Sequence, residues 1–176
     1  MRRTTCPEDE EQMQTLQSRD AAESLLLLLL GPGCLGAVLV SLHFPDLELG
    51  SEVLVPVIND PGGVMPLIFL GLIPVPLDIE LNSYNTNLEE VKKRITKKTS
   101  AVIVCHIGGE PADIIPIKKY LKKNKIKLIE DCSQSHGASI NKQKVGTFGD
   151  IAFFSTMSSK LHSTGGQGGV VYSNNK

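Results

Sequence analysis

The chain has 176 residues, of which 41% are hydrophobic and 21% are charged, and its formal net charge is −1. This length and composition are typical of one globular domain with a sizeable core, and they exclude disordered, collagen-like and disulfide-dense proteins. The near-neutral charge supplies no field that would attract a phosphate backbone, so we expect no nucleic-acid partner.

The N-terminal quarter of the chain divides into a polar and an apolar part. Residues 1–24 are rich in Glu and Gln and predict a loosely attached arm, so residues 25–176 are expected to form the folded domain. Leu25–Phe44 carries no formally charged residue and is just long enough to cross a bilayer as a helix. Three glycines and a proline interrupt it, and acidic residues precede it, so we expect neither a membrane span nor a signal peptide.

Six short apolar runs follow, separated by amphipathic segments, an alternation typical of β-α-β units. The predicted strands are Glu52–Pro56, Ile73–Leu77, Ser100–His106, Lys127–Glu130, Ile151–Ser155 and Gly169–Tyr172. Most are nearly continuous Val, Ile and Leu, which favours a parallel sheet covered on both faces. Leu88–Ile95 and Asp113–Lys123 have apolar residues at helical spacing and predict crossover helices, the second with a solvated lysine-rich face. The sequence therefore predicts an α/β protein with three α/β/α layers and a mostly parallel sheet.

The cysteines give no sign of a metal or disulfide framework. The four cysteines are Cys6, Cys34, Cys105 and Cys132. Their spacing is too wide for a CxxC redox motif or a closed zinc site. We therefore expect reduced thiols, no metal and a cytoplasmic protein.

Residues whose side chains could take part in catalysis are densest between Ile129 and Val171. Asp131 follows one predicted strand, Ser155 ends the next, and Lys160 comes five residues later in a glycine-rich segment. Such an order predicts a pocket at the carboxyl edge of a parallel sheet. A partly desolvated lysine can form a Schiff base with an aldehyde, and a buried carboxylate can keep a pyridine nitrogen protonated. Together they predict a site for pyridoxal 5'-phosphate.

Four motifs in this region occur in a specific order. They are Glu130-Asp-x-x-Gln-x-x-Gly-Ala138, Val145-Gly-x-x-Gly-Asp150, Phe154-Ser-x-x-x-x-Lys160 and Gly166-x-Gly-Gly169. This order resembles the DegT/DnrJ/EryC1/StrS family of sugar aminotransferases, which have the type I pyridoxal-phosphate-dependent fold. The resemblance covers roughly residues 45–176.

The resemblance implies a role for each matching residue. Lys160 corresponds to the lysine that holds the cofactor as a Schiff base and then moves a proton. Asp131 corresponds to the carboxylate that pairs with the pyridinium nitrogen. Gln134 corresponds to the glutamine beside the cofactor ring, and Ser155 to a hydroxyl that binds the cofactor phosphate. His106 and His136 lie near the site in the motif order and receive no role, because such histidines are more often structural groups with satisfied hydrogen bonds.

Two segments depart from the family pattern. Where the family has a Ser-Gly-Thr turn that cradles the phosphate, this chain has Gly33, Cys34 and Leu35, which keep the backbone N–H donors and lose the hydroxyl. The following Gly36–Phe44 is then expected to be a buried helix. After Pro56, the family commonly has Thr and an aromatic residue that stacks on the ring, whereas this chain has Asn59-Asp60, which predicts weaker cofactor binding.

The resemblance also implies the reaction and its partners. We expect transfer of an amino group from a donor such as glutamate to a nucleotide-linked keto sugar, in a homodimer. Family members continue well past the lysine segment, so we expect a truncated, partial large domain without the small C-terminal domain. Two alternatives remain open: a deoxysugar dehydratase of the same family, and a catalytically inactive truncated relative.

Overall fold

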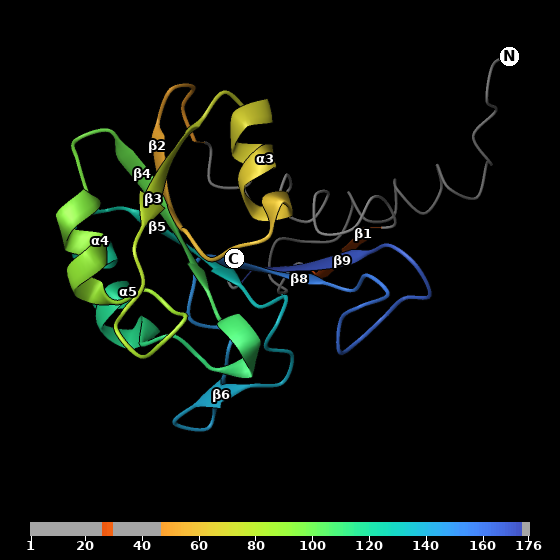
Figure 1. Ribbon diagram of the computed structural model, residues 1–176. Helices are drawn as coiled ribbons and strands as arrows, with labels where there is room; N and C mark the ends of the chain where they lie inside the picture. Colours follow the sequence, from red (N-terminus) through yellow and green to blue (C-terminus); the bar gives the residue numbers. More distant parts are fainter. Residues whose placement is uncertain (1–25, 30–46, 174–176) are drawn as a thin grey trace, which may run out of the picture.

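The computed structural model describes the backbone of residues 26–29 and the whole of residues 47–173. The predicted arm, the helix expected at Gly36–Phe44 and the cradle at residues 33–35 lie outside the described residues. The described part is a seven-stranded sheet with helices on both faces, which confirms the predicted α/β/α layering (Figure 1).

The sheet has the strand order β1-β9-β8-β5-β4-β2-β3. The strands are β1 (Leu26–Leu29), β2 (Glu52–Pro56), β3 (Ile73–Leu77), β4 (Thr99–Cys105), β5 (Lys127–Asp131), β8 (Ile151–Ser155) and β9 (Gly169–Ser173). Strands β6 (Ser139–Ile140) and β7 (Gln143–Lys144) form a separate two-stranded sheet. All six predicted strands are present, with ends shifted by at most one residue.

Strand β9 is the exception to the parallel arrangement. It runs antiparallel to both β8 and β1, whereas β3, β2, β4, β5 and β8 are mutually parallel. The chain turns back after β8 through residues 156–168 without a crossover helix, and an antiparallel return needs none. Strand β1 lies at the start of the apolar run Leu25–Phe44 and was not predicted. Within residues 26–29 and 47–173, no helix is both long and apolar enough to cross a membrane.

Two of the three α-helices within residues 47–173 were predicted. In α5 (Ile114–Lys123), the side chains of Ile114, Ile117 and Leu121 are buried against the sheet. In α4 (Leu88–Arg94), the Asn87 side chain caps the helix by accepting from the backbone N–H of Glu90 at 3.0 Å. These two helices cover one face of the sheet.

Helix α3 (Pro61–Phe69) covers the other face and was not predicted. It contains two glycines and an internal proline, Pro66, which weaken any helical signal. Its start is nevertheless well defined, because Asp60 Oδ1 accepts from the backbone N–H of Gly62 at 2.8 Å and Pro61 occupies the first turn.

The core follows from the alternation of side chains along each central strand. In β2, Val53 and Val55 pack beneath α3, while Leu54 packs beneath α4 and α5. Strand β4 is divided in the same way and is buried along its whole length apart from Ser100. Burying each of these aliphatic side chains stabilises the fold by about 1.5–3 kcal/mol before entropy is counted. Near-continuous apolar strands are therefore a consequence of having helices on both faces.

The outer edge of the sheet, at β3, is protected by proline. Pro74 and Pro76 pair in register with Val53 and Val55 of β2. Since the backbone N–H of Ile73 donates inward to Ser51 at 2.9 Å, the nitrogens of the two alternating prolines face the open edge. Proline has no N–H, so this edge offers few donors to another strand.

Candidate active site

Asp131 is the last residue of β5 and lies at the carboxyl edge of the sheet, with only 7% of its surface exposed. Its Oδ1 accepts from the backbone N–H of Ser133 at 2.9 Å, and its Oδ2 accepts from the thiol of Cys105 at 3.6 Å. Burial raises the pKa of Asp131, and hydrogen bonds from Ser133 and Cys105, together with the positive charge of Lys160, oppose that rise. The neighbouring donors therefore favour the ionised carboxylate against the effect of burial.

Ser155 ends β8, the parallel neighbour of β5, so both strands bring their last side chains to the same edge of the sheet. Ser155 is fully buried, and its backbone N–H donates to Ser133 Oγ at 3.0 Å. Its own Oγ is buried with no hydrogen-bond partner among the described residues. Buried hydroxyls are almost always paired in native proteins, so this one is a candidate contact for a ligand or a water.

Lys160 lies in the connection between β8 and β9. Two backbone hydrogen bonds hold this connection as a narrow loop, from Thr156 to Gly168 and from Ser158 to Gly166, each at 2.8 Å. The Lys160 side chain is partly buried, and its charge influences the pKa of both Asp131 and His136. The turn after β8 therefore returns the lysine to the edge where β5 ends.

Gln134 lies on the loop after β5 and is exposed. Its Oε1 accepts from the backbone N–H of Gly108 at 3.0 Å. Gly108 belongs to the 3₁₀ turn Ile107–Gly109 that follows β4, and its positive φ of 63° suits glycine. The glutamine thus links the loops that follow two adjacent strands.

His136 is a residue of this region that the sequence left without a role. Its ring packs against the rings of Phe154 and His162, at centroid distances of 5.5 and 5.3 Å. Both ring nitrogens are buried and unpaired among the described residues. Burial lowers the pKa of His136, and the charges of His162 and Lys160 lower it further. A neutral imidazole therefore packs beside the lysine loop.

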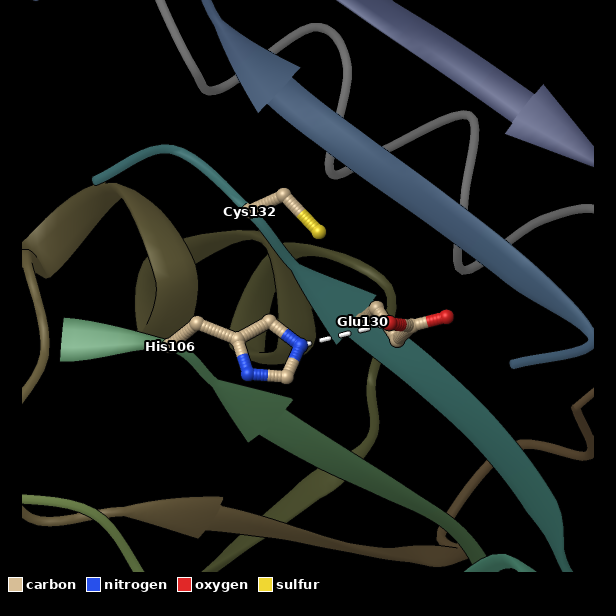
Figure 2. Close-up of side chains that lie close together, drawn as sticks. All are labelled: His106, Glu130 and Cys132. Carbon is tan, nitrogen blue, oxygen red and sulfur yellow. Dashed lines mark hydrogen bonds and ion pairs between the residues drawn. The ribbon is translucent and has the colours of Figure 1, made fainter. Parts of the chain in front are cut away.

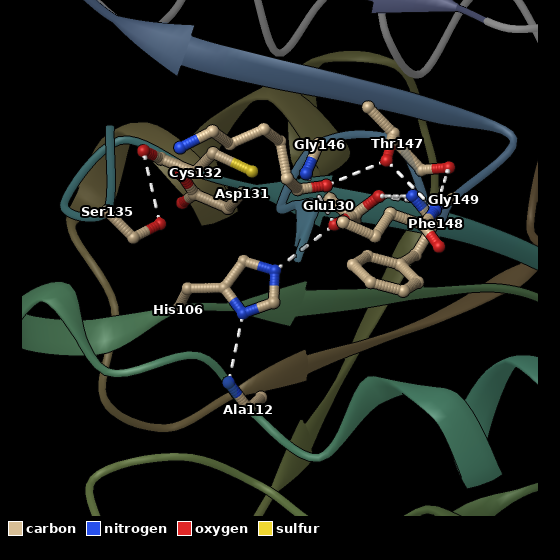
Figure 3. A network of polar contacts seen from close by, with 12 residues as sticks. His106, Ala112, Glu130, Asp131, Cys132, Ser135, Gly146, Thr147, Phe148 and Gly149 are labelled. Atoms are coloured by element: carbon tan, nitrogen blue, oxygen red, sulfur yellow. Dashed lines mark hydrogen bonds and ion pairs between the residues drawn. The ribbon is translucent and has the colours of Figure 1, made fainter. Parts of the chain in front are cut away.

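Glu130 organises the loop that precedes β8. Its side chain is fully buried and points to the opposite side of β5 from Asp131 (Figure 3). Oε2 accepts from the backbone N–H of Gly146 at 2.7 Å, and Oε1 accepts from those of Phe148 and Gly149 at 2.6 and 2.5 Å. The motif Val145-Gly-x-x-Gly-Asp150 is therefore the chain segment that wraps around this carboxylate.

His106 completes the surroundings of Glu130 (Figure 3). The backbone N–H of Ala112 donates to its Nδ1 at 3.0 Å, so Nδ1 carries no proton and the proton lies on Nε2. Nε2 lies 3.2 Å from Glu130 Oε2 and donates to it. Four donors thus surround one buried carboxylate and fix the end of β5 that carries Asp131.

A metal is an alternative reading of the same cluster. The ligand atoms of His106, Glu130 and Cys132 lie within 4.8 Å of one another (Figure 2). However, both nitrogens of His106 and both oxygens of Glu130 are already engaged by protein groups. Burial raises the pKa of the Cys132 thiol well above its usual range, and the nearby carboxylates add to this, so it stays protonated and is a poor ligand. These three residues therefore have a structural role.

Comparison with known proteins agrees with the motif order. The profile of the DegT/DnrJ/EryC1/StrS aminotransferase family matches residues 32–176. The chain belongs to this family. A relative, the GDP-perosamine synthase of Vibrio cholerae, is 40% identical over 139 residues, which cover 77% of this chain and 38% of that protein.

Solved structures of DegT/DnrJ/EryC1/StrS relatives share the fold. An aminotransferase from Psychrobacter cryohalolentis matches with a TM-score of 0.81 and 28% identity, over 93% of this chain and 40% of that one. The E. coli GDP-4-keto-6-deoxy-D-mannose-3-dehydratase with bound hydrated pyridoxal phosphate matches with a TM-score of 0.77 and 26% identity, over 94% and 42%. The chain thus spans about two fifths of the proteins it matches. Membership of this family implies dependence on pyridoxal phosphate.

Four of the residues assigned from the DegT/DnrJ/EryC1/StrS resemblance lie in the described part of the chain, and residues 33–35 lie outside it. Asp131, Ser155 and Lys160 converge at one edge, and Gln134 lies on the loop beside them. At the Asn59-Asp60 departure, Asp60 caps α3, and Asn59 Oδ1 accepts from the Asp60 N–H at 2.8 Å. These two side chains therefore serve the start of a helix.

Sequence reasoning missed two structural contributors. Ser133 links Asp131 to the backbone of Ser155, and Glu130 anchors the preceding loop. The available signal for Glu130 was an acid inside a buried strand, since such a charge requires partners. No comparable signal singles out Ser133, because serine is common in loops.

Proposed function

We propose that this chain is the cofactor-binding part of a pyridoxal-phosphate-dependent aminotransferase that acts on a nucleotide-linked keto sugar. The observation that carries the proposal is the convergence of Lys160, the buried carboxyl of Asp131 and the unpaired hydroxyl of Ser155 at one sheet edge. The family of the chain supports the reaction class, and the name of the V. cholerae relative supports the substrate class.

The residues present fit pyridoxal phosphate. The unpaired Ser155 Oγ is a buried donor suited to a phosphate oxygen. Asp131 is a carboxylate suited to a protonated ring nitrogen, and Lys160 supplies an amine for the aldehyde. Gln134 would contact the ring, and residues 33–35 would contribute backbone N–H groups to the phosphate, as the family resemblance implies.

The chain's own groups then have distinct tasks. When bound, the cofactor supplies an electron sink that lets an amino group pass from a donor to a carbonyl carbon. Lys160 Nζ would hold the cofactor through its amine and would also serve to carry a proton between the reacting atoms. Asp131 would keep the ring nitrogen protonated, a task that requires the ionised carboxylate. Burial raises the pKa of Asp131, and Ser133, Cys105 and the Lys160 charge oppose that rise.

The wider setting of this activity is also part of the proposal. The family resemblance supports an amino donor such as glutamate, a homodimer and a cytoplasmic location. The similarity to the E. coli dehydratase supports a deoxysugar dehydratase as the second candidate. Lys160 favours the aminotransferase, because some dehydratases of the family replace this lysine by histidine.

Loading the purified chain with pyridoxal phosphate and then adding glutamate tests the proposal. An aminotransferase releases 2-oxoglutarate in amounts set by the loaded cofactor. Replacing Ser155 by Ala should weaken cofactor binding roughly 10-fold or more, the loss of one hydrogen bond to a charged group. Ser158→Ala, exposed on the same loop, is the matched control and should bind as the wild type does. Equal affinity of the Ser155 variant and the wild type would contradict the assigned phosphate contact, and cofactor binding without 2-oxoglutarate release would favour an inactive relative.

A further inference from the structure

Cys105 occupies a specific position relative to Asp131. It is the last residue of β4, and the register of the parallel pair β4–β5 places it directly opposite Asp131. Its thiol lies 3.6 Å from Asp131 Oδ2, within the range of a sulfur hydrogen bond. Both side chains are buried, with 1% and 7% of their surface exposed, so bulk water has little access to this contact.

The two oxygens of Asp131 are held from different directions. The backbone N–H of Ser133 binds Oδ1, and the thiol of Cys105 binds Oδ2. The thiol donates a single hydrogen bond, which orients Oδ2. The second lone pair of Oδ2 can then accept from another group. An aliphatic side chain at position 105 would supply no donor to Oδ2.

We propose that Cys105 is a positioning residue, whose thiol hydrogen bond favours the ionised form of Asp131 and orients its carboxylate to accept from a protonated ring nitrogen. This inference rests on the function proposed above, in which Asp131 pairs with the cofactor ring. The charged or titratable groups that face Asp131 from the neighbouring loops are Lys160, His136 and Cys132, and their contributions are separate from that of Cys105.

Three substitutions separate the donor from the packing volume. Cys105→Val removes the donor and fills the site with a slightly larger aliphatic group. Cys105→Ser reduces the volume and keeps a hydroxyl donor. Cys105→Ala removes both. A hydrogen-bonding role predicts that the Ser variant behaves like the wild type and the Val variant like the Ala variant. A packing role predicts the opposite pairing.

The first readout is the titration of the Asp131 carboxyl, followed by carbon NMR in the cofactor-free full chain and assigned with Asp131→Asn. The pKa of Asp131 should rise in the Val and Ala variants and stay near the wild-type value in the Ser variant. The second readout is the affinity for pyridoxal phosphate, which should fall roughly five-fold in the Val variant and little in the Ser variant. An unchanged titration in Cys105→Val, or a Ser variant that titrates like Ala, overturns the inference.

A measurement on the unmodified protein covers the case in which a variant does not fold. The infrared S–H stretching band of Cys105 should shift with the same pH midpoint as the Asp131 carbon signal, and a band insensitive to that titration overturns the inference. Since neither titration uses the cofactor, failure of the proposed aminotransferase function would leave the Cys105–Asp131 result intact. Conversely, a trapped cofactor with an unresponsive thiol would reject only the role of Cys105.

Discussion

Replacing Glu130 by Gln should destabilise the fold severely, although the two side chains have nearly the same shape. Glu130 is fully buried and accepts from three backbone N–H groups and from His106. A glutamine has one oxygen, so its NH₂ group must face the donors on one side of the site. Either pair of donors, Phe148 with Gly149 or Gly146 with His106, then loses its acceptor.

His106 cannot relieve the conflict by moving its proton. If Nε2 became an acceptor for the glutamine amide, Nδ1 would carry a proton and would face the N–H of Ala112, which now donates to it. At least two buried donors therefore stay unpaired. At about 1–3 kcal/mol each, the expected loss is roughly 2–6 kcal/mol, a large part of the about 5–15 kcal/mol that stabilises a typical domain.

Urea unfolding followed by circular dichroism measures this loss. The matched control is Glu89→Gln, which removes an exposed carboxylate of α4 that pairs with Lys92. Such surface pairs contribute about 0–1 kcal/mol, so the control should unfold almost as the wild type does. If Glu130→Gln also unfolds within about 0.5 kcal/mol of the wild type, the carboxylate is not the anchor of this loop.

Three further predictions concern the loops and helix start around the site. Gly149→Ala should lower the free energy of unfolding by about 1–3 kcal/mol, because a Cβ there would lie within 3 Å of two backbone carbonyl oxygens. In the control, Gly166→Ala, the added Cβ meets no atom within 4 Å, so this change should be nearly neutral. Thermal unfolding compares the two variants. Asp60→Ala should lower stability by about 1 kcal/mol through loss of the α3 cap, and Asp113→Ala, at a helix start without a side-chain cap bond, should cost less; equal losses would contradict the cap. Because burial lowers the pKa of His136, the unfolded chain binds more protons than the folded one, and stability is lost as the pH falls below the ordinary histidine value of 6.5. His136→Gln should therefore reduce the difference in unfolding free energy between about pH 7.5 and about pH 5.5.

The sequence was sufficient for most strands because both faces of the sheet are covered. Runs such as Thr99–Cys105 are buried on two sides and read as continuous apolar segments. The same property hides strand direction, so the reversal of β9 could not be read from its residues. A clue was the lack of any helical pattern in residues 156–168, since a parallel return needs a crossover.

The limits of sequence reasoning at the site have similar physical causes. The positions of Asp131 and Ser155 follow from strand ends, which can be predicted from apolar runs. The contact between Cys105 and Asp131 depends on the register of β4 against β5, which no local pattern encodes. Helix α3 was missed because packing and the Asp60 cap override the poor propensity of a Pro-Gly-Gly start. The assignment of residues 33–35 to a phosphate cradle stays a prediction.

The most direct test of the account is to locate the lysine that binds pyridoxal phosphate. The purified chain is incubated with the cofactor, reduced with borohydride, digested, and examined by mass spectrometry for the modified peptide. The account predicts a reduced adduct on Lys160 that is lost in Lys160→Ala and retained in Lys142→Ala, an exposed lysine of the β6–β7 turn. An adduct of the same yield in the Lys160 variant, or one placed on another lysine in the wild type, would contradict it.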